Sequence, residues 1–238
     1  MAIQKHALFG LALTMTAPAL AADTVEADVP DTSRAVVYAG GTAGRDIGGN
    51  LGASLALSGT LDHGFVLGLD IDSERHRETN DDGETIGHGS STGGQVTLGY
   101  AVSGKWGAAT VYAGPAYSRT TGQVDPNVRR RSTGLTAAVG SDGDLTAGAW
   151  QLDWVGSYTI KARAYEVTLD ATHDIGGRLR AGVEGTLSGG LDYVRRTAGA
   201  VVVIDIARRA TLQLSAGAEF IRDESTGGFA GLSISRSF

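Results

Sequence analysis

The sequence predicts an all-β protein: an antiparallel transmembrane β-barrel of about 12 strands (roughly 10 to 14), preceded by an N-terminal signal peptide. Three observations support this prediction. Apolar and polar residues alternate in runs along most of the chain, and tight turns alternate with long polar connections. After residue 22, no apolar run has the length of a membrane-spanning helix, so any insertion into a membrane must use strands.

The N-terminus has the pattern of a secretory signal. A short basic region with Lys5 precedes an apolar run over residues 7–16 and the small-residue sequence ALA at 19–21, which predicts cleavage after Ala21 or Ala22. An uncleaved membrane anchor is less favoured because the apolar run is short. We expect a signal peptide at 1–21, a flexible periplasmic segment at 22–33 and the barrel at 34–238.

Composition excludes several classes of protein. The 238 residues include 36 Gly and no Cys, so neither disulfides nor thiol chemistry are available, and hydrogen bonds must close the fold. A net charge of -6 argues against nucleic acid as a partner. No motif indicates a cofactor, since the Gly-rich stretches lie at strand ends rather than at strand-to-helix turns.

The stretch GAWQLDWVGSYTI at 148–160 shows the alternation most clearly. Trp150, Leu152 and Trp154 fall on one side of an extended chain, and Gln151 and Asp153 fall on the other. Further strands are expected at 64–74, 95–102, 165–172, 178–187, 211–220 and 228–238, and less regular ones at 34–44, 51–60, 106–118, 132–141 and 193–206.

The connections between strands indicate which face meets lipid. A soluble sandwich or lipocalin-like barrel would turn its apolar face inward, whereas a membrane barrel turns it outward. Short turns are expected at 60–64, 103–105, 142–145, 175–178 and 207–210, and long polar loops at 76–92 and 119–132. Short turns at one rim and long loops at the other are typical of periplasmic and extracellular ends, so both termini are expected on the periplasmic side.

The last strand, GFAGLSISRSF, ends on Phe238 and resembles the C-terminal signal that delivers barrels to the outer-membrane assembly machinery. Arg236 departs from the usual apolar residue, and a soluble edge strand is the alternative interpretation. With the apolar face in lipid, the expected residues at the membrane interfaces are Trp150, Trp154, Tyr158, Tyr165 and Phe238.

Three segments carry a family resemblance. They are VVYAGGTAGRDIGGNLGASLALSGTLDHGFVLGLDIDSERHR at 36–77, VYAGPAYS at 111–118 and GLDYVRRTAGAVV at 190–202. The chain resembles the cellulose biosynthesis protein BcsS family, exported barrels associated with bacterial cellulose-synthesis loci. The resemblance implies an outer-membrane role in cellulose production or export and implies no catalytic motif.

The polar face of the strands is expected to line the lumen. Its charged members are Asp70, Asp72, Glu74, Asp153, Glu166, Asp170, Glu184 and Glu219, with Arg178, Arg180 and Arg195. These groups could pair across a filled interior, or line water and favour cations and neutral sugars over anions. Few aromatic residues are expected in the lumen, which argues against passage of a glucan.

The expected outward loops hold the remaining candidates. His76, His88 and Ser90, with Asp81, Asp82 and Glu84, could suggest a hydrolase or a metal site, but a polar Gly-rich loop lacks the rigidity that catalysis requires, and no ligand spacing fits a metal. His173 is expected at an interface. The basic loop Arg129, Arg130 and Arg131 could bind lipopolysaccharide phosphates or an acidic polysaccharide, or simply be solvated.

The sequence therefore predicts a non-enzymatic outer-membrane barrel that is an accessory component of cellulose biosynthesis or secretion. A small diffusion pore or adhesin-type barrel unrelated to cellulose is the alternative. The expected partners are outer-membrane lipids, the assembly machinery through Phe238, and components of a cellulose-secretion system, without nucleic acid.

Overall fold

The computed structural model describes residues 33–238 except 80–84, 126–127, 191–193 and 222–225. The expected signal peptide at 1–21 lies outside the described residues, as does the segment at 22–33 apart from Ser33. No helix in the described part of the chain is long and apolar enough to cross a membrane.

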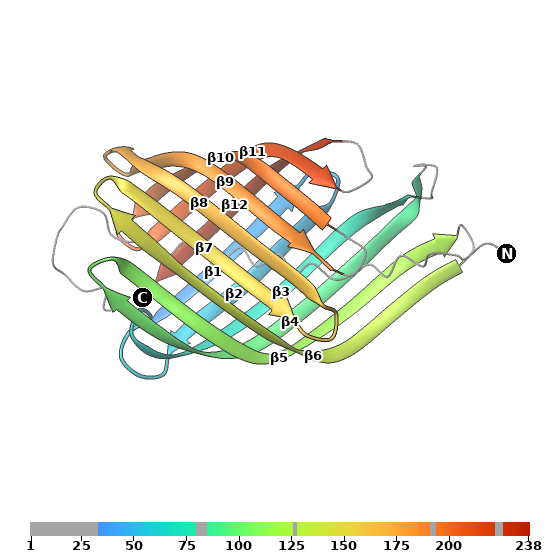
Figure 1. Ribbon diagram of the computed structural model, residues 1–238, viewed down its shortest axis with the longest axis horizontal. Helices are drawn as coiled ribbons and strands as arrows, with labels where there is room; N and C mark the ends of the chain where they lie inside the picture. The colour runs from blue at the N-terminus through green and yellow to red at the C-terminus, as the bar shows by residue number, and fades with distance from the viewer. Residues whose placement is uncertain (1–32, 80–84, 126–127, 191–193, 222–225) are drawn as a thin grey trace.

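Twelve antiparallel strands form a closed barrel in which each strand pairs with its neighbours in the sequence (Figure 1). The prediction of an all-β barrel is confirmed. The strands are β1 (Ala35–Ala43), β2 (Ile47–Ala56), β3 (Gly64–Thr79), β4 (Thr85–Gly104), β5 (Gly107–Asp125), β6 (Val128–Ala147), β7 (Trp150–Thr159), β8 (Ala164–Gly176), β9 (Leu179–Gly189), β10 (Val194–Ala207), β11 (Ala210–Ile221) and β12 (Gly227–Ser237).

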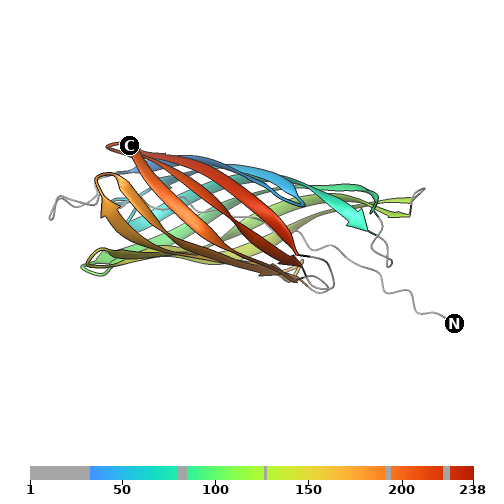
Figure 2. The same cartoon turned by 90° about the horizontal axis from the view of Figure 1, so that it is seen from above.

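The first and last strands close the barrel. β1 pairs with β12 from Val36↔Ser237 to Ala43↔Ala230, so neither strand is left with an open edge. Beyond this ladder, the Arg34 amide donates to the Phe238 carbonyl at 2.7 Å. Both ends of the described barrel therefore lie at the rim that carries the short turns, and Figure 2 shows β1 and β12 side by side along the barrel.

The two faces of the sheet have opposite character. Outward apolar side chains are widely exposed, with Leu98 at 52% and Leu135 at 72% of their surface. Inward polar side chains are buried, with Arg180 at 3% and Glu219 at 0%. An apolar exterior around a polar interior is the arrangement of a barrel that is surrounded by lipid.

Four consecutive strands are the longest of the barrel. β3, β4, β5 and β6 contain 16, 20, 19 and 20 residues, and their ends project past the neighbouring strands at the rim opposite the start of β1 and the end of β12 (Figure 1). The expected loops at 76–92 and 119–132 are therefore wrong, because most of these residues form strand. We call residues 73–79, 85–92, 119–125 and 128–133 the outer extension.

The turn expected at 142–145 is also wrong. β6 continues to Ala147, and Asp142 and Asp144 point into the lumen from it. The sequence DGD suggested a turn because the outward position between the two carboxylates is Gly143. That position is covered by Trp154 of β7, whose ring lies 2.6 Å from where a Cβ on Gly143 would be. The indole thus supplies the apolar surface that Gly143 lacks.

Leu98→Arg should lower the free energy of unfolding by about 2–4 kcal/mol, because it places a charge in the middle of the outward apolar surface of β4. Leu57→Arg is the matched control. Leu57 is similarly exposed but follows β2 at the rim of the barrel, where the cost should be about 0–1 kcal/mol. Urea unfolding in phospholipid vesicles, followed by tryptophan fluorescence, measures both. Equal losses would contradict the lipid-facing assignment of β4.

Candidate functional site

The lumen is the candidate functional site, and most of the charged residues expected there do point into it. Asp72, Glu166, Asp170, Arg180, Arg195 and Glu219 are buried, Asp70 and Glu184 line internal cavities, and Glu74 and Asp153 contact lumenal side chains. Asp142, which was expected in a turn, lines the same cavity as Asp70. Arg178 is the exception. It lies exposed in the turn between β8 and β9, because β9 begins only at Leu179.

The Arg195 side chain crosses the lumen near the rim from which the outer extension projects. Its Nε lies 2.5 Å from Glu219 Oε1 on the adjacent strand β11, and its Nη1 lies 3.5 Å from Glu74 Oε1 and 3.9 Å from Asp46 Oδ2. β10 and β3 are separated in the barrel by β11, β12, β1 and β2, so these contacts join opposite walls. We call Arg195, Glu219, Glu74 and Asp46 the Arg195 cluster.

Further polar contacts cross or line the lumen closer to the rim where β1 starts and β12 ends. Gln213 of β11 donates to Asp170 Oδ2 on β8 at 3.0 Å and to Glu184 Oε2 at 3.5 Å. Near the short-turn rim, Arg180 donates to Gln151 Oε1, and Gln151 donates to Asp153 Oδ1 at 2.8 Å. Charged and amide side chains thus contact one another at successive depths, but not every buried atom is paired: among the described residues, Asp170 Oδ1 and Arg180 Nη2 have no hydrogen-bond partner.

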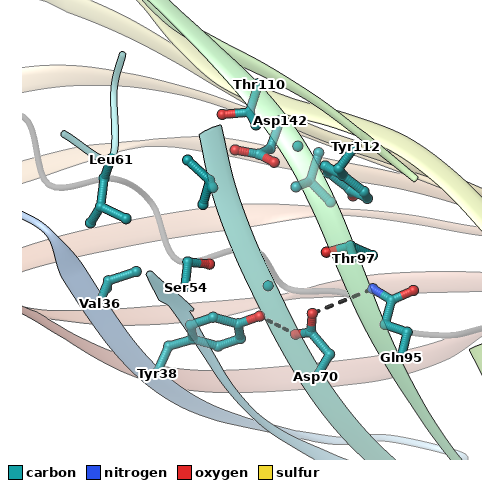
Figure 3. A pocket seen from close by; sticks show the side chains of 14 residues that line it. Val36, Tyr38, Ser54, Leu61, Asp70, Gln95, Thr97, Thr110, Tyr112 and Asp142 are labelled. Atoms are coloured by element: carbon teal, nitrogen blue, oxygen red, sulfur yellow. Dashed lines mark hydrogen bonds between the residues drawn. The ribbon is translucent and has the colours of Figure 1, made fainter. Parts of the chain in front are cut away.

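A small cavity of about 70 Å³ lies against the wall formed by β1 to β7 (Figure 3). The Tyr38 hydroxyl donates to Asp70 Oδ1, and Gln95 donates to Asp70 Oδ2 at 3.3 Å. Tyr112 and Asp142 face the same space from β5 and β6. None of the described residues that line this tyrosine cavity is Lys, Arg or His, so its charge is acidic.

Tyr38 and Tyr112 were missed by the sequence analysis, which expected few aromatic residues in the lumen. Each ring lies over a glycine on a neighbouring strand, where an added Cβ would meet the Tyr38 ring at 2.3 Å from Gly52 and the Tyr112 ring at 2.6 Å from Gly140. The rings therefore pack flat against the wall, and Tyr38 is only 8% exposed. Phe229 is a third lumenal aromatic residue, in a cavity on the opposite wall.

An apolar cluster narrows the lumen at the short-turn rim. Leu61, in the connection between β2 and β3, is 4% exposed and packs with Val36, Ala56, Val66 and Ala101. The Leu61 amide donates to the Ser33 carbonyl at 3.0 Å, which holds the connection against the start of the barrel.

The described members of the expected hydrolase or metal site lie on both faces of the sheet: His88 and Ser90, two residues apart on β4, are exposed on the outward face, and His76 of β3 is on the other face. In the outer extension, His76 pairs with Gly89, and Ser90 pairs with Arg75, so His76 and Ser90 belong to opposite faces of the sheet. Asp81, Asp82 and Glu84 lie outside the described residues. His173 contacts the outward ring of Trp150 edge-on, with the ring centroids 4.8 Å apart.

The expected interface aromatics are distributed along the outer surface. Trp150 begins β7 at the short-turn rim and is 57% exposed, whereas Tyr158 near the other end of β7 pairs with Tyr165 of β8. Trp154 lies between them over Gly143, and Phe238 is exposed at the closing seam with the Arg236 guanidinium 5.0 Å from its ring centre.

The basic loop expected at Arg129, Arg130 and Arg131 is instead part of strand β6, paired with Gln123, Gly122 and Thr121 of β5. A run of three arginines looked like a solvated loop because neither face of this part of the strand is apolar. The Arg131 side chain is exposed on the outward face, and the side chains of Arg129 and Arg130 lie outside those that the structure describes.

Residues 36–238 match the model of the family described as cellulose biosynthesis protein BcsS. This chain belongs to the BcsS family. The match spans the barrel from β1 to the C-terminus, so the family resemblance seen in the sequence is confirmed. No curated protein matches the sequence.

Solved structures similar to this BcsS-family barrel are also outer-membrane barrels. They include the KdgM porin in complex with disordered oligogalacturonate (11% identity, TM-score 0.51, 85% of this chain and 99% of that one). A second is the β domain of the Bordetella autotransporter BrkA, with 13% identity and a TM-score of 0.55 over 87% of this chain and 100% of that one. A third is the CymD monoaromatic hydrocarbon channel, with 7% identity and a TM-score of 0.50 over 87% of this chain and 89% of that one. At these identities the likeness shows the fold alone, that of a barrel of the outer membrane.

Arg195→Ala should lower the free energy of unfolding by about 3–5 kcal/mol, because it leaves the buried Glu219 carboxylate without its ion-pair partner. Arg196→Ala is the matched control. Arg196 is the next residue along β10 and is exposed on the outward face, so its loss should change stability by about 0.5 kcal/mol or less. Urea unfolding in vesicles compares the two, and similar values would show that the Arg195 cluster contributes no net stability.

Proposed function

We propose that this barrel is a non-catalytic accessory component of cellulose biosynthesis or secretion, and that it works without passing the glucan through its lumen. Membership of the BcsS family supports the link to cellulose. The single observation that carries the rest is the Arg195 cluster, in which one guanidinium contacts Glu219 on its own wall and Glu74 on the opposite wall.

The remainder of the lumen supports the same proposal. Gln213 reaches Asp170 from a strand that is not adjacent in the barrel, and Leu61 packs inward at the short-turn rim. A glucan conduit also needs aromatic faces on which sugar rings can stack. Tyr38 instead lies flat over Gly52 and is mostly covered, so it offers little stacking surface.

An accessory role would then act through the surfaces at the two rims. The outer extension places four polar strand ends above the membrane, where secretion components or the emerging polysaccharide could meet them. In this role the protein would be exported through a signal peptide that is cleaved after Ala21 or Ala22. The barrel would be delivered to the outer-membrane assembly machinery through its C-terminal strand, whose Phe238 ring is exposed on the outer surface.

A small cation-preferring diffusion pore is the second candidate, and the charge of the lumen favours it. Asp70 and Asp142 line the tyrosine cavity, whose described lining residues include no guanidinium, and Asp144 is buried two residues further along β6. Acidic walls favour cations over anions in a water-filled passage. This candidate requires that ions pass the Arg195 cluster.

Deletion of the gene should lower cellulose output, and a plasmid copy of the wild-type barrel should restore it. Planar bilayers containing the purified barrel should show no steady conductance. Normal cellulose output in the deletion strain, combined with steady cation-selective conductance, would support the pore and contradict the accessory role.

The double substitution Glu74→Gln and Asp46→Asn should create conductance, because it removes the attraction of Arg195 to the far wall and leaves the Arg195–Glu219 pair in place. The control is Asp174→Asn with Asp205→Asn, at the opposite end of the barrel. Cellulose output should be restored equally by both variants. If opening the lumen itself changes cellulose output, the lumen is part of the secretion path.

A further inference from the structure

The outward face of the outer extension carries arginines directly above the apolar surface. The last apolar row across the four long strands is Ile71, Gly94, Tyr117 and Leu135, each paired with the next. Two residues further along each strand comes a row of Ser73, Thr92, Arg119 and Thr133, and then a row of Arg75, Ser90, Thr121 and Arg131.

These arginines point away from the lumen. Arg75, Arg119 and Arg131 are exposed, and each is separated by an even number of residues from the residue of the last apolar row on its own strand (Ile71, Tyr117 and Leu135). The pairing of the long strands stays in register up to Glu78/Thr79 on β3 and Gln123/Asp125 on β5, so no bulge reverses the faces before these positions.

The height of the arginines matches the headgroup layer. Two residues of strand advance about 7 Å, and with a tilt of about 40° they rise roughly 5 Å, so the two rows lie about 5 and 10 Å beyond the apolar edge. The polar region on each side of a bilayer is about 5–8 Å thick. The row of Arg119 therefore lies within this layer, and the row of Arg75 and Arg131 lies about 2–5 Å beyond it, a distance over which a long arginine side chain can reach back to the lipid phosphates.

The two rows also have the chemistry of a phosphate site. They contain three arginines and five hydroxyl residues and no carboxylate, although the chain as a whole has a net charge of -6. The carboxylates of the same strand, Asp72 and Glu74, are on the inward face. Arginine binds phosphate through paired N–H donors, and serine and threonine hydroxyls add further donors.

We propose that Arg75, Arg119 and Arg131, with the hydroxyls between them, bind the phosphate groups of lipopolysaccharide in the outer leaflet. This phosphate belt is a lipid site on the outside of the barrel and does not depend on what the lumen does. It would fix the long-strand side of the barrel to the charged layer of the membrane. An acidic polysaccharide, which would meet the same arginines from the aqueous side, is the competing occupant in the test.

The test titrates purified lipopolysaccharide onto the detergent-solubilised full barrel, comparing wild type with Arg75→Gln/Arg119→Gln/Arg131→Gln. The charge-matched control is Lys105→Gln/Arg178→Gln/Arg208→Gln, three exposed cations at the short-turn rim. The belt variant should bind about tenfold more weakly, as expected for several exposed ion pairs, and the control should bind like wild type. Raising the salt concentration should weaken wild-type binding towards that of the belt variant.

Three further probes identify the ligand: dephosphorylated lipopolysaccharide, inorganic phosphate and alginate. Dephosphorylated lipopolysaccharide should bind wild type as weakly as the intact lipid binds the belt variant, and neither inorganic phosphate nor alginate should compete at equal concentration. Equal binding by the belt variant, an equal loss in the control, tight binding of the dephosphorylated lipid, or competition by alginate would each overturn the proposal. If the triple variant fails to fold, Arg119→Gln alone should still weaken binding about twofold, and unchanged binding would overturn it.

Discussion

The hydrogen-bond ladder between β1 and β12 is the constraint on which the rest of the structure depends. In hydrocarbon every backbone amide and carbonyl must be paired within the protein, and a sheet achieves this only by closing on itself. This chain has no cysteine, so the eight residue pairs from Val36↔Ser237 to Ala43↔Ala230 close the barrel without a disulfide. Within the membrane, closure then leaves two environments for side chains, lipid and lumen.

Those two environments explain the distribution of charge. Carboxylates excluded from lipid gather inside, where few cations are available among the described residues to offset them. Arg195 is consequently shared among Glu219, Glu74 and Asp46, and Arg180 is held by an amide beside Asp153. The same alternation of inward and outward side chains places the arginines of the outer extension on the outward face, away from Glu74. Interior pairing and exterior phosphate binding are thus two results of one alternation along β3 and its neighbours.

The sequence was sufficient to predict the closed barrel, its approximate strand number and the inward direction of residues such as Glu219, because alternation within a strand is a local signal. It failed where the signal depends on a neighbouring strand. Gly143 was assigned to a turn because the sequence does not show that Trp154 of the next strand covers it. The inward direction of Tyr38 was not predicted because it depends on the space that Gly52 of the next strand leaves for the ring. The outer extension looked like loop because both of its faces are polar. Contacts across the lumen, such as Arg195 to Glu74, require the complete barrel.

The unequal strand lengths also make the barrel directional within the plane of the membrane. β4 and β6 have 20 residues each, whereas β9 has 11 and β12 has 11. The outer extension consequently borders one side of this rim, and the strands on the other side end sooner (Figure 1). A large molecule that approaches along the membrane surface would meet the outer extension on one side of the barrel and the shorter strands on the other. Neighbouring assemblies could therefore recognise the rotational orientation of the barrel as well as its position.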